Sequence, residues 1–211
     1  MESTPRVFLL SPAYCGGRRA GIAMQPASAL PIARQLREGR LDLGSAFSFF
    51  SGLYFRGKLT YARKFGRPGD ARVEPTLIIT PTRGLMTPAA LVTPELILEF
   101  AAVDVSADDP RYRVPLERDV TAMAHGLPAH AKVVLLGSVA SGKYVDLLQP
   151  LLGGRLCCPT SFIGRGDMSR GGLLLRSADA GEELEYQPLT PGVRPRGPRP
   201  PKLVPLKRSR P

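Results

Sequence analysis

The chain has 211 residues, of which 43% are hydrophobic, and this length and composition suit one globular domain with a buried core. No run approaches the roughly 20 apolar residues of a membrane span. The amino terminus lacks the basic and apolar regions of a secretory signal. We therefore expect a cytoplasmic protein without a membrane partner, and the sequence leaves its oligomeric state open.

The net charge of +11 is distributed unevenly along the chain. Residues 191–211 hold seven of the 29 basic residues and none of the 18 acidic ones, which leaves residues 1–190 with a net charge of +4. Because this end is also rich in proline, we predict an α/β domain over 1–190 and a disordered tail over 191–211. The tail either binds nucleic acid or an acidic surface by releasing counterions, or only increases solubility. Its basic residues are Arg194, Arg196, Arg199, Lys202, Lys207, Arg208 and Arg210.

The cysteines and histidines favour neither a disulfide framework nor a metal site. Cys157 and Cys158 are adjacent and Cys15 is the third cysteine, and an odd count is a poor framework for disulfides. His125 and His130 lie in a connector rich in glycine, proline and alanine, with no C-x-x-C pattern beside them. We therefore expect no metal and no cofactor.

Hydrophobic periodicity predicts strands and helices that alternate along the chain. Strands are expected at residues 6–10, 76–80 and 132–136, with shorter candidates at 103–105, 155–158 and 173–177, the last of which could instead be helical. Helices are expected at residues 29–40 (a helix or a loop), 47–65, 94–101, 115–124 and 143–151. This alternation predicts a single-domain α/β fold with three layers, in which helices flank a mainly parallel central sheet.

The predicted helix at residues 47–65 interleaves aromatic and basic side chains. Tyr54 and Tyr61 recur at helical spacing with four cations around them. Such a face could stack on bases and neutralise phosphates. Burial of the tyrosines, with the cations in solvent, fits the spacing better, although Gly52 and Gly57 each weaken a helix interior by about 1 kcal/mol. The four cations are Arg56, Lys58, Arg63 and Lys64.

Three apolar strands end abruptly in loops that contain glycine, small polar residues and a cation. These loops cover residues 11–19, 80–84 and 137–143, and residues 162–172 have the same chemistry. Because loops that follow parallel strands meet at the carboxyl edge of the sheet, we expect the four segments to form one pocket for an anionic ligand. Its expected ligand-binding residues are Ser11, Gly16, Gly17, Arg18, Arg19, Arg83, Gly137, Ser138, Gly142, Lys143, Gly164, Arg165 and Arg170, and Gly166 would allow further backbone approach.

The segment from Gly137 to Lys143 fits the pattern G-x-x-x-x-G-K of a phosphate-binding loop. Tyr144 stands where that motif needs a serine or threonine hydroxyl for magnesium, and Pro150 is expected to stop the following helix early. A nucleoside triphosphatase is therefore disfavoured. Backbone N–H groups and Lys143 could instead bind a phosphate without hydrolysis, or the glycines could only permit a tight turn.

Asp167 and Tyr144 are the candidate catalytic residues. Asp167 lies between Arg165 and Arg170 in a segment that is too polar to be expected in the core. Its carboxylate could orient a sugar hydroxyl, a base edge or a water. The alternative is that the segment is only a flexible loop. The corresponding enzyme would act on the glycosidic bond of a nucleoside, nucleotide or sugar phosphate. Further candidates are Ser138, Asp146 and the thiol of Cys15, whose pKa the neighbouring arginines would lower.

Four segments, in this order, resemble a family of small bacterial α/β proteins related to the peroxide-stress DNA-binding protein and to a domain of archaeosine synthase. The resemblance implies association with nucleic acid or modified nucleobases, a role in nucleobase modification or repair, and a fold distantly like that of uracil-DNA glycosylases. It supplies no catalytic residues, and the Arg18-Arg19 loop and the basic tail depart from the family pattern. The leading hypothesis is thus a protein that binds nucleic acid or a nucleotide-like ligand. The four segments are Leu53 to Ala62, Leu77 to Pro88, Val133 to Leu148 and Ile163 to Arg165.

Overall fold

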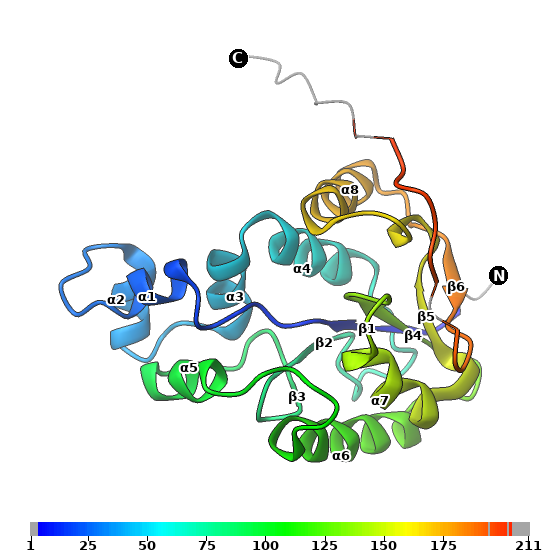
Figure 1. Ribbon diagram of the computed structural model, residues 1–211, viewed down its shortest axis with the longest axis horizontal. Helices are drawn as coiled ribbons and strands as arrows, with labels where there is room; N and C mark the ends of the chain where they lie inside the picture. Colours follow the sequence, from blue (N-terminus) through cyan, green and yellow to red (C-terminus); the bar gives the residue numbers. More distant parts are fainter. Residues whose placement is uncertain (1–3, 194, 202, 204–211) are drawn as a thin grey trace.

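The structure, a computed structural model, describes residues 4–193, 195–201 and 203. Its centre is a six-stranded sheet with the strand order β3-β2-β1-β4-β5-β6 (Figure 1). The four inner strands are parallel, and the two short edge strands are antiparallel to their neighbours. The predicted α/β class and its mainly parallel sheet are therefore confirmed. The strands are β1 (Arg6–Leu10), β2 (Thr76–Ile79), β3 (Leu85–Met86), β4 (Lys132–Leu136), β5 (Leu156–Pro159) and β6 (Tyr186–Pro188).

Helices cover both faces of this sheet and complete the three predicted layers in one domain. Helices α4 and α8 lie on one face, and α6 and α7 lie on the other (Figure 1). Because side chains alternate across a strand, Phe8 and Leu10 join the first core, whereas Val7 and Leu9 join the second. The helices are α1 (Arg18–Met24), α2 (Pro31–Arg37), α3 (Leu43–Ser51), α4 (Leu53–Phe65), α5 (Pro94–Ala101), α6 (Pro110–Gly126), α7 (Gly142–Leu152) and α8 (Asp167–Ala180), with short 3-10 turns at Gly153–Arg155 and Thr160–Phe162.

The single helix predicted at residues 47–65 is two helices. Gly52 separates α3 from α4 with φ of +65°, a conformation that glycine adopts without steric cost. The Gly52 N–H still donates to the carbonyl of Ser48, so the first helix closes before the chain turns. This break gives α3 and α4 different directions, and only α4 runs along the sheet (Figure 1).

Pro115 does not begin a helix and Pro150 does not end one, contrary to the prediction. Helix α6 begins at Pro110, capped by the Asp109 carboxylate that accepts from Arg111 N at 2.9 Å, and Pro115 lies inside it. Helix α7 continues past Pro150 and ends at Gly153, whose φ of +54° stops it. The strand candidate at 103–105 was wrong, since this segment is irregular. Of the two alternatives for residues 173–177, the helical one is confirmed, because the segment belongs to α8.

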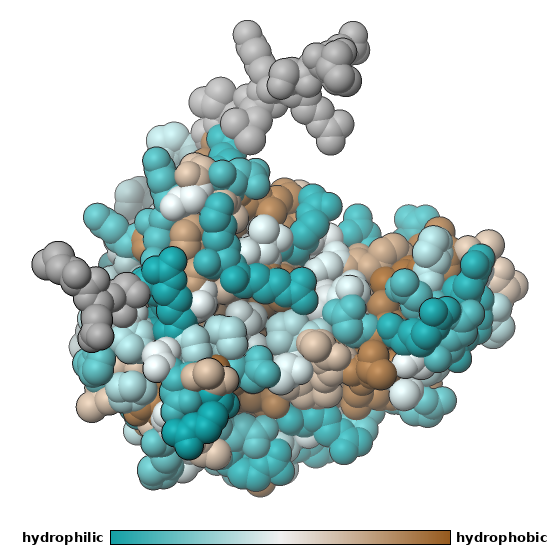
Figure 2. All heavy atoms as spheres, turned by 180° about the vertical axis from the view of Figure 1, so that it is seen from behind, coloured by the Kyte–Doolittle hydropathy of each residue, from teal (hydrophilic) through white to brown (hydrophobic). Residues whose placement is uncertain are grey.

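Helices α1 and α2 form a lobe that projects beyond the carboxyl end of β1, at the right of Figure 2. Hydrophilic side chains predominate on the face of the molecule seen there, and hydrophobic ones gather at the base of the lobe. In the part of the chain that the structure describes, no helix combines the length and the apolar character needed to span a membrane.

The described part of the predicted tail lies against the segment that precedes α8. A Cβ on Gly164 would stand 2.2 Å from the Pro198 carbonyl oxygen, and Arg165 donates to the Pro201 carbonyl at 3.5 Å. Arg196 and Arg199 belong to this described stretch. The other five basic residues of the predicted tail lie outside the described residues: Arg194, Lys202, Lys207, Arg208 and Arg210.

Candidate ligand-binding and catalytic site

The carboxyl ends of β1 and β4 mark the point where the chain order of the sheet changes direction. From β1, the next strand along the chain, β2, lies on one side, and β4 lies on the other. Ser11, the first residue after β1, donates its N–H to the Leu136 carbonyl at 3.2 Å and so holds the two strand ends together. Ligands of open α/β sheets bind in the crevice at such a switch point.

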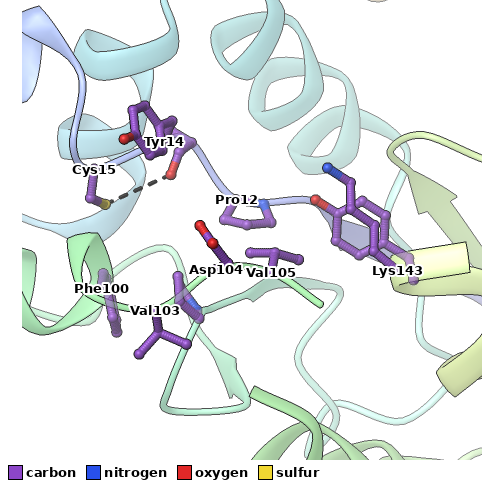
Figure 3. A pocket seen from close by; sticks show the side chains of 11 residues that line it. Pro12, Tyr14, Cys15, Phe100, Val103, Asp104, Val105 and Lys143 are labelled. Carbon is purple, nitrogen blue, oxygen red and sulfur yellow. Dashed lines mark hydrogen bonds between the residues drawn. The ribbon is translucent and has the colours of Figure 1, made fainter. Parts of the chain in front are cut away.

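A cavity of about 310 Å³ opens beside these strand ends (Figure 3). The loops after β1 and β2, the end of α5 with the loop that follows it, and the start of α7 all contribute to its wall. Apolar groups such as Phe100 and Val103 form one part of that wall, and Lys143 and Asp104 bring charged groups to it. The lining residues are Pro12–Cys15, Pro81, Phe100, Val103–Val105, Lys143 and Tyr144.

Lys143 is the predicted cation that the structure places at this cavity. It is exposed, in the first turn of α7, with its ammonium 5.5 Å from the centre of the Tyr144 ring. Ser141 precedes this helix as N-cap, and its side chain does not accept from the helix N–H groups. Free N–H groups and a lysine at a helix N-terminus favour an anionic ligand. Of the phosphate-loop segment from Gly137 to Lys143, Lys143 is the residue that lines this cavity.

The predicted arginines lie elsewhere. Arg83 forms an ion pair with Glu99 at 2.6 Å and lines a separate cavity between α5 and α6. Arg19 donates to the Phe49 carbonyl at 3.3 Å, and Arg165 donates to the Ser161 carbonyl at 3.0 Å. Arg18 is exposed on α1. The four loops therefore supply one cation to the switch-point cavity rather than the predicted cluster of six.

The predicted glycines have mainly steric roles. A Cβ on Gly137 would stand 3.0 Å from the Ser11 Cβ, so glycine lets the ends of β1 and β4 approach closely. A Cβ on Gly16 would clash with the Tyr14 ring, and Gly17 is the N-cap of α1. Gly142 is the first residue of α7. Ser138 accepts a hydrogen bond from the Ser141 hydroxyl at 3.4 Å, within the same loop.

The fourth predicted segment is not the exposed loop that its polarity indicated. Gly166 is the N-cap of α8, and Arg170 in the second turn is buried. The Arg170 guanidinium donates to the Phe162 carbonyl at 3.0 Å and to the Asp167 carboxylate at 3.4 Å. Arg170 therefore joins α8 to the preceding turn, and its charge is satisfied internally. Asp167 itself is exposed at the helix start and does not line the switch-point cavity.

A buried polar cluster at the end of β1 was missed by the sequence interpretation. Lys58 was expected to face solvent, but its side chain is 1% exposed. Its ammonium nitrogen lies 2.6 Å from the Ser11 carbonyl oxygen and 2.9 Å from the Ser11 hydroxyl oxygen. The signal was present in the spacing, because Lys58 follows Tyr54 by four residues and precedes Tyr61 by three, which places it on the buried stripe of α4.

Two tyrosines complete this cluster. The Tyr144 hydroxyl is hydrogen-bonded to Ser11, and burial raises the tyrosine pKa above its usual value despite that bond. Burial also raises the pKa of Tyr54, with Arg170 opposing the rise. Within the described residues, the Tyr54 hydroxyl is buried and has no hydrogen-bond partner of acceptable geometry. A buried hydroxyl without a partner carries a desolvation cost that a bound ligand could recover.

Cys15 does not have the reactive character that its neighbouring arginines suggested. The thiol is buried and donates to the Ala13 carbonyl at 3.7 Å (Figure 3). Burial raises its pKa to about 12, so the thiolate is scarce at neutral pH. In the described part of the chain, no group of three or more His, Cys, Asp or Glu residues is placed to hold a metal ion.

Comparison with known proteins found no matching family model, no matching curated protein and no matching solved structure.

Proposed function

We propose that this protein is a cytoplasmic nucleotide-binding protein whose ligand occupies the switch-point cavity. The observation that carries the proposal is the position of Lys143 and the α7 N-terminus beside a cavity at the carboxyl edge of a parallel sheet. Both features favour the anionic end of a ligand. The cavity volume of about 310 Å³ is at the lower end of the range for small-molecule sites, which suits a mononucleotide or a smaller phosphate ester.

The rest of the cavity wall complements the uncharged part of such a ligand. Phe100 and Val103 offer apolar surface to a base or sugar ring, and the Asp104 carboxylate can accept hydrogen bonds from sugar hydroxyls. Asp104 also disfavours a ligand that is anionic throughout. A ligand with one anionic end and one hydroxyl-bearing end therefore fits better than a polyanion.

Calorimetric titration with a panel of nucleoside monophosphates and sugar phosphates tests this proposal. We expect at least one compound to bind, and Lys143→Ala to weaken its binding by tenfold or more because an ion pair is lost. Lys132→Ala is the matched control, since Lys132 lies at the start of β4, away from the switch-point cavity. If no compound binds, or if Lys143→Ala binds as tightly as the unaltered protein, the proposal is wrong.

Nucleic-acid binding is a second candidate, and a different surface favours it. A groove of about 560 Å³ between α3 and α4 is lined by three cations and three hydroxyls. Arg56 and Arg63 are exposed there without an ion pair among the described residues. Because Tyr54 and Tyr61 are buried, base stacking is not available, and this groove would contact phosphates. The resemblance of residues 50–172 to a family associated with nucleic acid supports the same candidate. The groove residues are Ser45, Ser48, Arg56, Leu59, Thr60, Arg63 and Lys64.

A further inference from the structure

We propose that Ser11 and Lys58 form a nucleophile and general-base pair, and that the protein catalyses acyl transfer or hydrolysis on an ester or amide of a small anionic compound. This inference rests on the proposed ligand site, since the switch-point cavity would hold the substrate. It assigns a chemistry to the buried cluster, which the binding proposal leaves without a role.

The geometry of the pair suits proton transfer. The Lys58 nitrogen is 2.9 Å from the Ser11 Oγ and 2.6 Å from the Ser11 carbonyl oxygen. The Ser11 hydroxyl donates to the Leu136 carbonyl at 3.3 Å, so it has to rotate toward Lys58 before the proton transfer. A neutral amine can then donate one N–H to the Ser11 carbonyl and accept the Ser11 O–H with its lone pair. The two contacts thus fix both the position and the orientation of the base. Nucleophilic serine paired with lysine is an established variant of the serine, histidine and aspartate arrangement.

The surroundings of Lys58 favour its neutral form. Burial lowers its pKa from 10.5 to about 7, and Asp167 only partly opposes this shift. The aromatic rings of Tyr54 and Phe55 lie 4.5 and 4.7 Å from its nitrogen. The charged and titratable groups that face the pair are Tyr54 on α4, Tyr144 on α7, and Asp167 and Arg170 on α8. Among the described residues, no carboxylate forms an ion pair with Lys58.

Tyr144 connects the pair to the switch-point cavity. Its side chain lines the cavity, and its hydroxyl is hydrogen-bonded to Ser11. Ser11 is 6% exposed, so the Tyr144 side chain has to move before a substrate carbonyl reaches the serine oxygen. Tyr54, whose hydroxyl has no partner of acceptable geometry, provides a donor in the same cluster for the oxygen of that carbonyl.

The reaction then follows in balanced steps. The Lys58 amine takes the proton of the Ser11 hydroxyl as Oγ bonds to the carbonyl carbon. The tetrahedral intermediate collapses, the bond to the leaving alcohol or amine breaks, and the Lys58 ammonium gives its proton to that leaving group. Water next attacks the acyl ester, with Lys58 as base, and the acid leaves while Ser11 regains its proton.

Labelling with a small alkyl fluorophosphonate tests the pair without requiring knowledge of the substrate. Ser11 Oγ would form a bond to phosphorus as fluoride leaves, and Lys58 would accept the hydroxyl proton. We expect one adduct by intact mass spectrometry, located at Ser11 by peptide mapping. The labelling rate should rise with pH through a midpoint near 7 and then level off, because only the neutral amine is a base.

Variants separate the pair from other nucleophiles. Ser11→Ala should abolish labelling, and Lys58→Met should slow it by a hundredfold or more. Ser177→Ala, at another buried serine, and Lys132→Met, at the start of β4, should label at the rate of the unaltered protein. Tyr144→Ala should label faster, because the path from the cavity to Ser11 is then open. Thermal unfolding of each variant verifies that it is folded.

The outcome also separates this inference from the binding proposal. Ser11→Ala should still bind the nucleotide that the unaltered protein binds, since Lys143 and the α7 N-terminus remain. Any of three results would overturn the catalytic inference. These are no labelling of either the unaltered protein or Tyr144→Ala, labelling at a serine other than Ser11, and labelling of Lys58→Met at the same rate as the unaltered protein. If nucleotide binding is still observed together with any of these results, the binding proposal remains supported.

Discussion

Gly57 of α4 faces the backbone of Gly171 of α8 so closely that a Cβ on Gly57 would stand 2.5 Å from the Gly171 carbonyl oxygen. A Cβ on Gly171 would likewise stand 2.7 Å from the Tyr54 Cα. The two helices therefore cross with backbone against backbone. Since Lys58 and Arg170 are the adjacent residues, this crossing also brings the buried cluster together.

Gly57→Ala should destabilise the protein by about 1–3 kcal/mol, because the added methyl group can be accommodated only by separating the helices. The free energy of unfolding, from urea titration followed by circular dichroism, measures this. Gly21→Ala in α1 is the matched control, since a Cβ there meets nothing within 4 Å. That control should be neutral or stabilising by up to about 1 kcal/mol, from helix propensity. Equal effects of the two substitutions would contradict the close crossing.

Stability should rise with pH above 7 because of Lys58. Its pKa is lower in the folded protein, about 7, than the ordinary value of 10.5, so the unfolded chain binds the extra proton between these values. In this window the free energy of unfolding of the unaltered protein should gain up to about 1.4 kcal/mol per pH unit relative to Lys58→Met. Lys58→Met should be the more stable protein below pH 7. Urea titrations of both proteins at pH 6, 7.5 and 9 measure the difference, and parallel profiles would show that Lys58 is not buried as a neutral amine.

Removing charge from the groove between α3 and α4 should weaken nucleic-acid binding in a manner that depends on salt. The double substitution Arg56→Gln and Arg63→Gln should reduce the slope of log K against log salt by about 2, since two phosphate contacts are lost. Binding to single- and double-stranded DNA and RNA, with and without residues 191–211, separates the groove from the basic tail. Arg72→Gln is the control, because Arg72 already pairs with Asp70. Absence of any binding that depends on salt would remove the nucleic-acid candidate.

The three cysteines should react slowly in the folded protein. All are buried, and burial raises the pKa of Cys15 and of Cys158 to about 12. Titration with a chromogenic disulfide reagent at pH 8 should therefore release little of the reagent's coloured thiolate from the folded protein. After denaturant is added, all three cysteines should react at once. Rapid reaction of the Cys15 thiol in the folded protein would make Cys15 a candidate nucleophile again.

Much of the fold could be predicted because its signals are local. The strand at residues 6–10 and the helix at 94–101 have the predicted bounds. An apolar run marks the strand, and Thr93, which caps the helix, followed by Pro94 marks the helix start, so both signals are read from neighbouring residues. The break at Gly52 was missed, because a glycine inside a helical pattern indicates a weak point without saying whether the chain turns there. The helix at Asp167 was missed because a polar, glycine-rich start looks like a loop until its packing partner, α4, is known.

The sequence by itself showed that loops bearing glycine and cations follow the predicted parallel strands, and from this it predicted a ligand-binding edge of the sheet. Tertiary structure decided which side chains share that edge. Arg83 was expected to be available to a ligand, but in the structure it forms an ion pair with Glu99, sixteen residues later in the chain. Lys58 was expected to face solvent, but β1 and α8 bury it. The physical reason is that burial and ion pairing depend on contacts between residues far apart in the sequence. Periodicity shows which face of a helix is apolar, whereas the charge state and hydrogen-bond partner of a side chain depend on what packs against it.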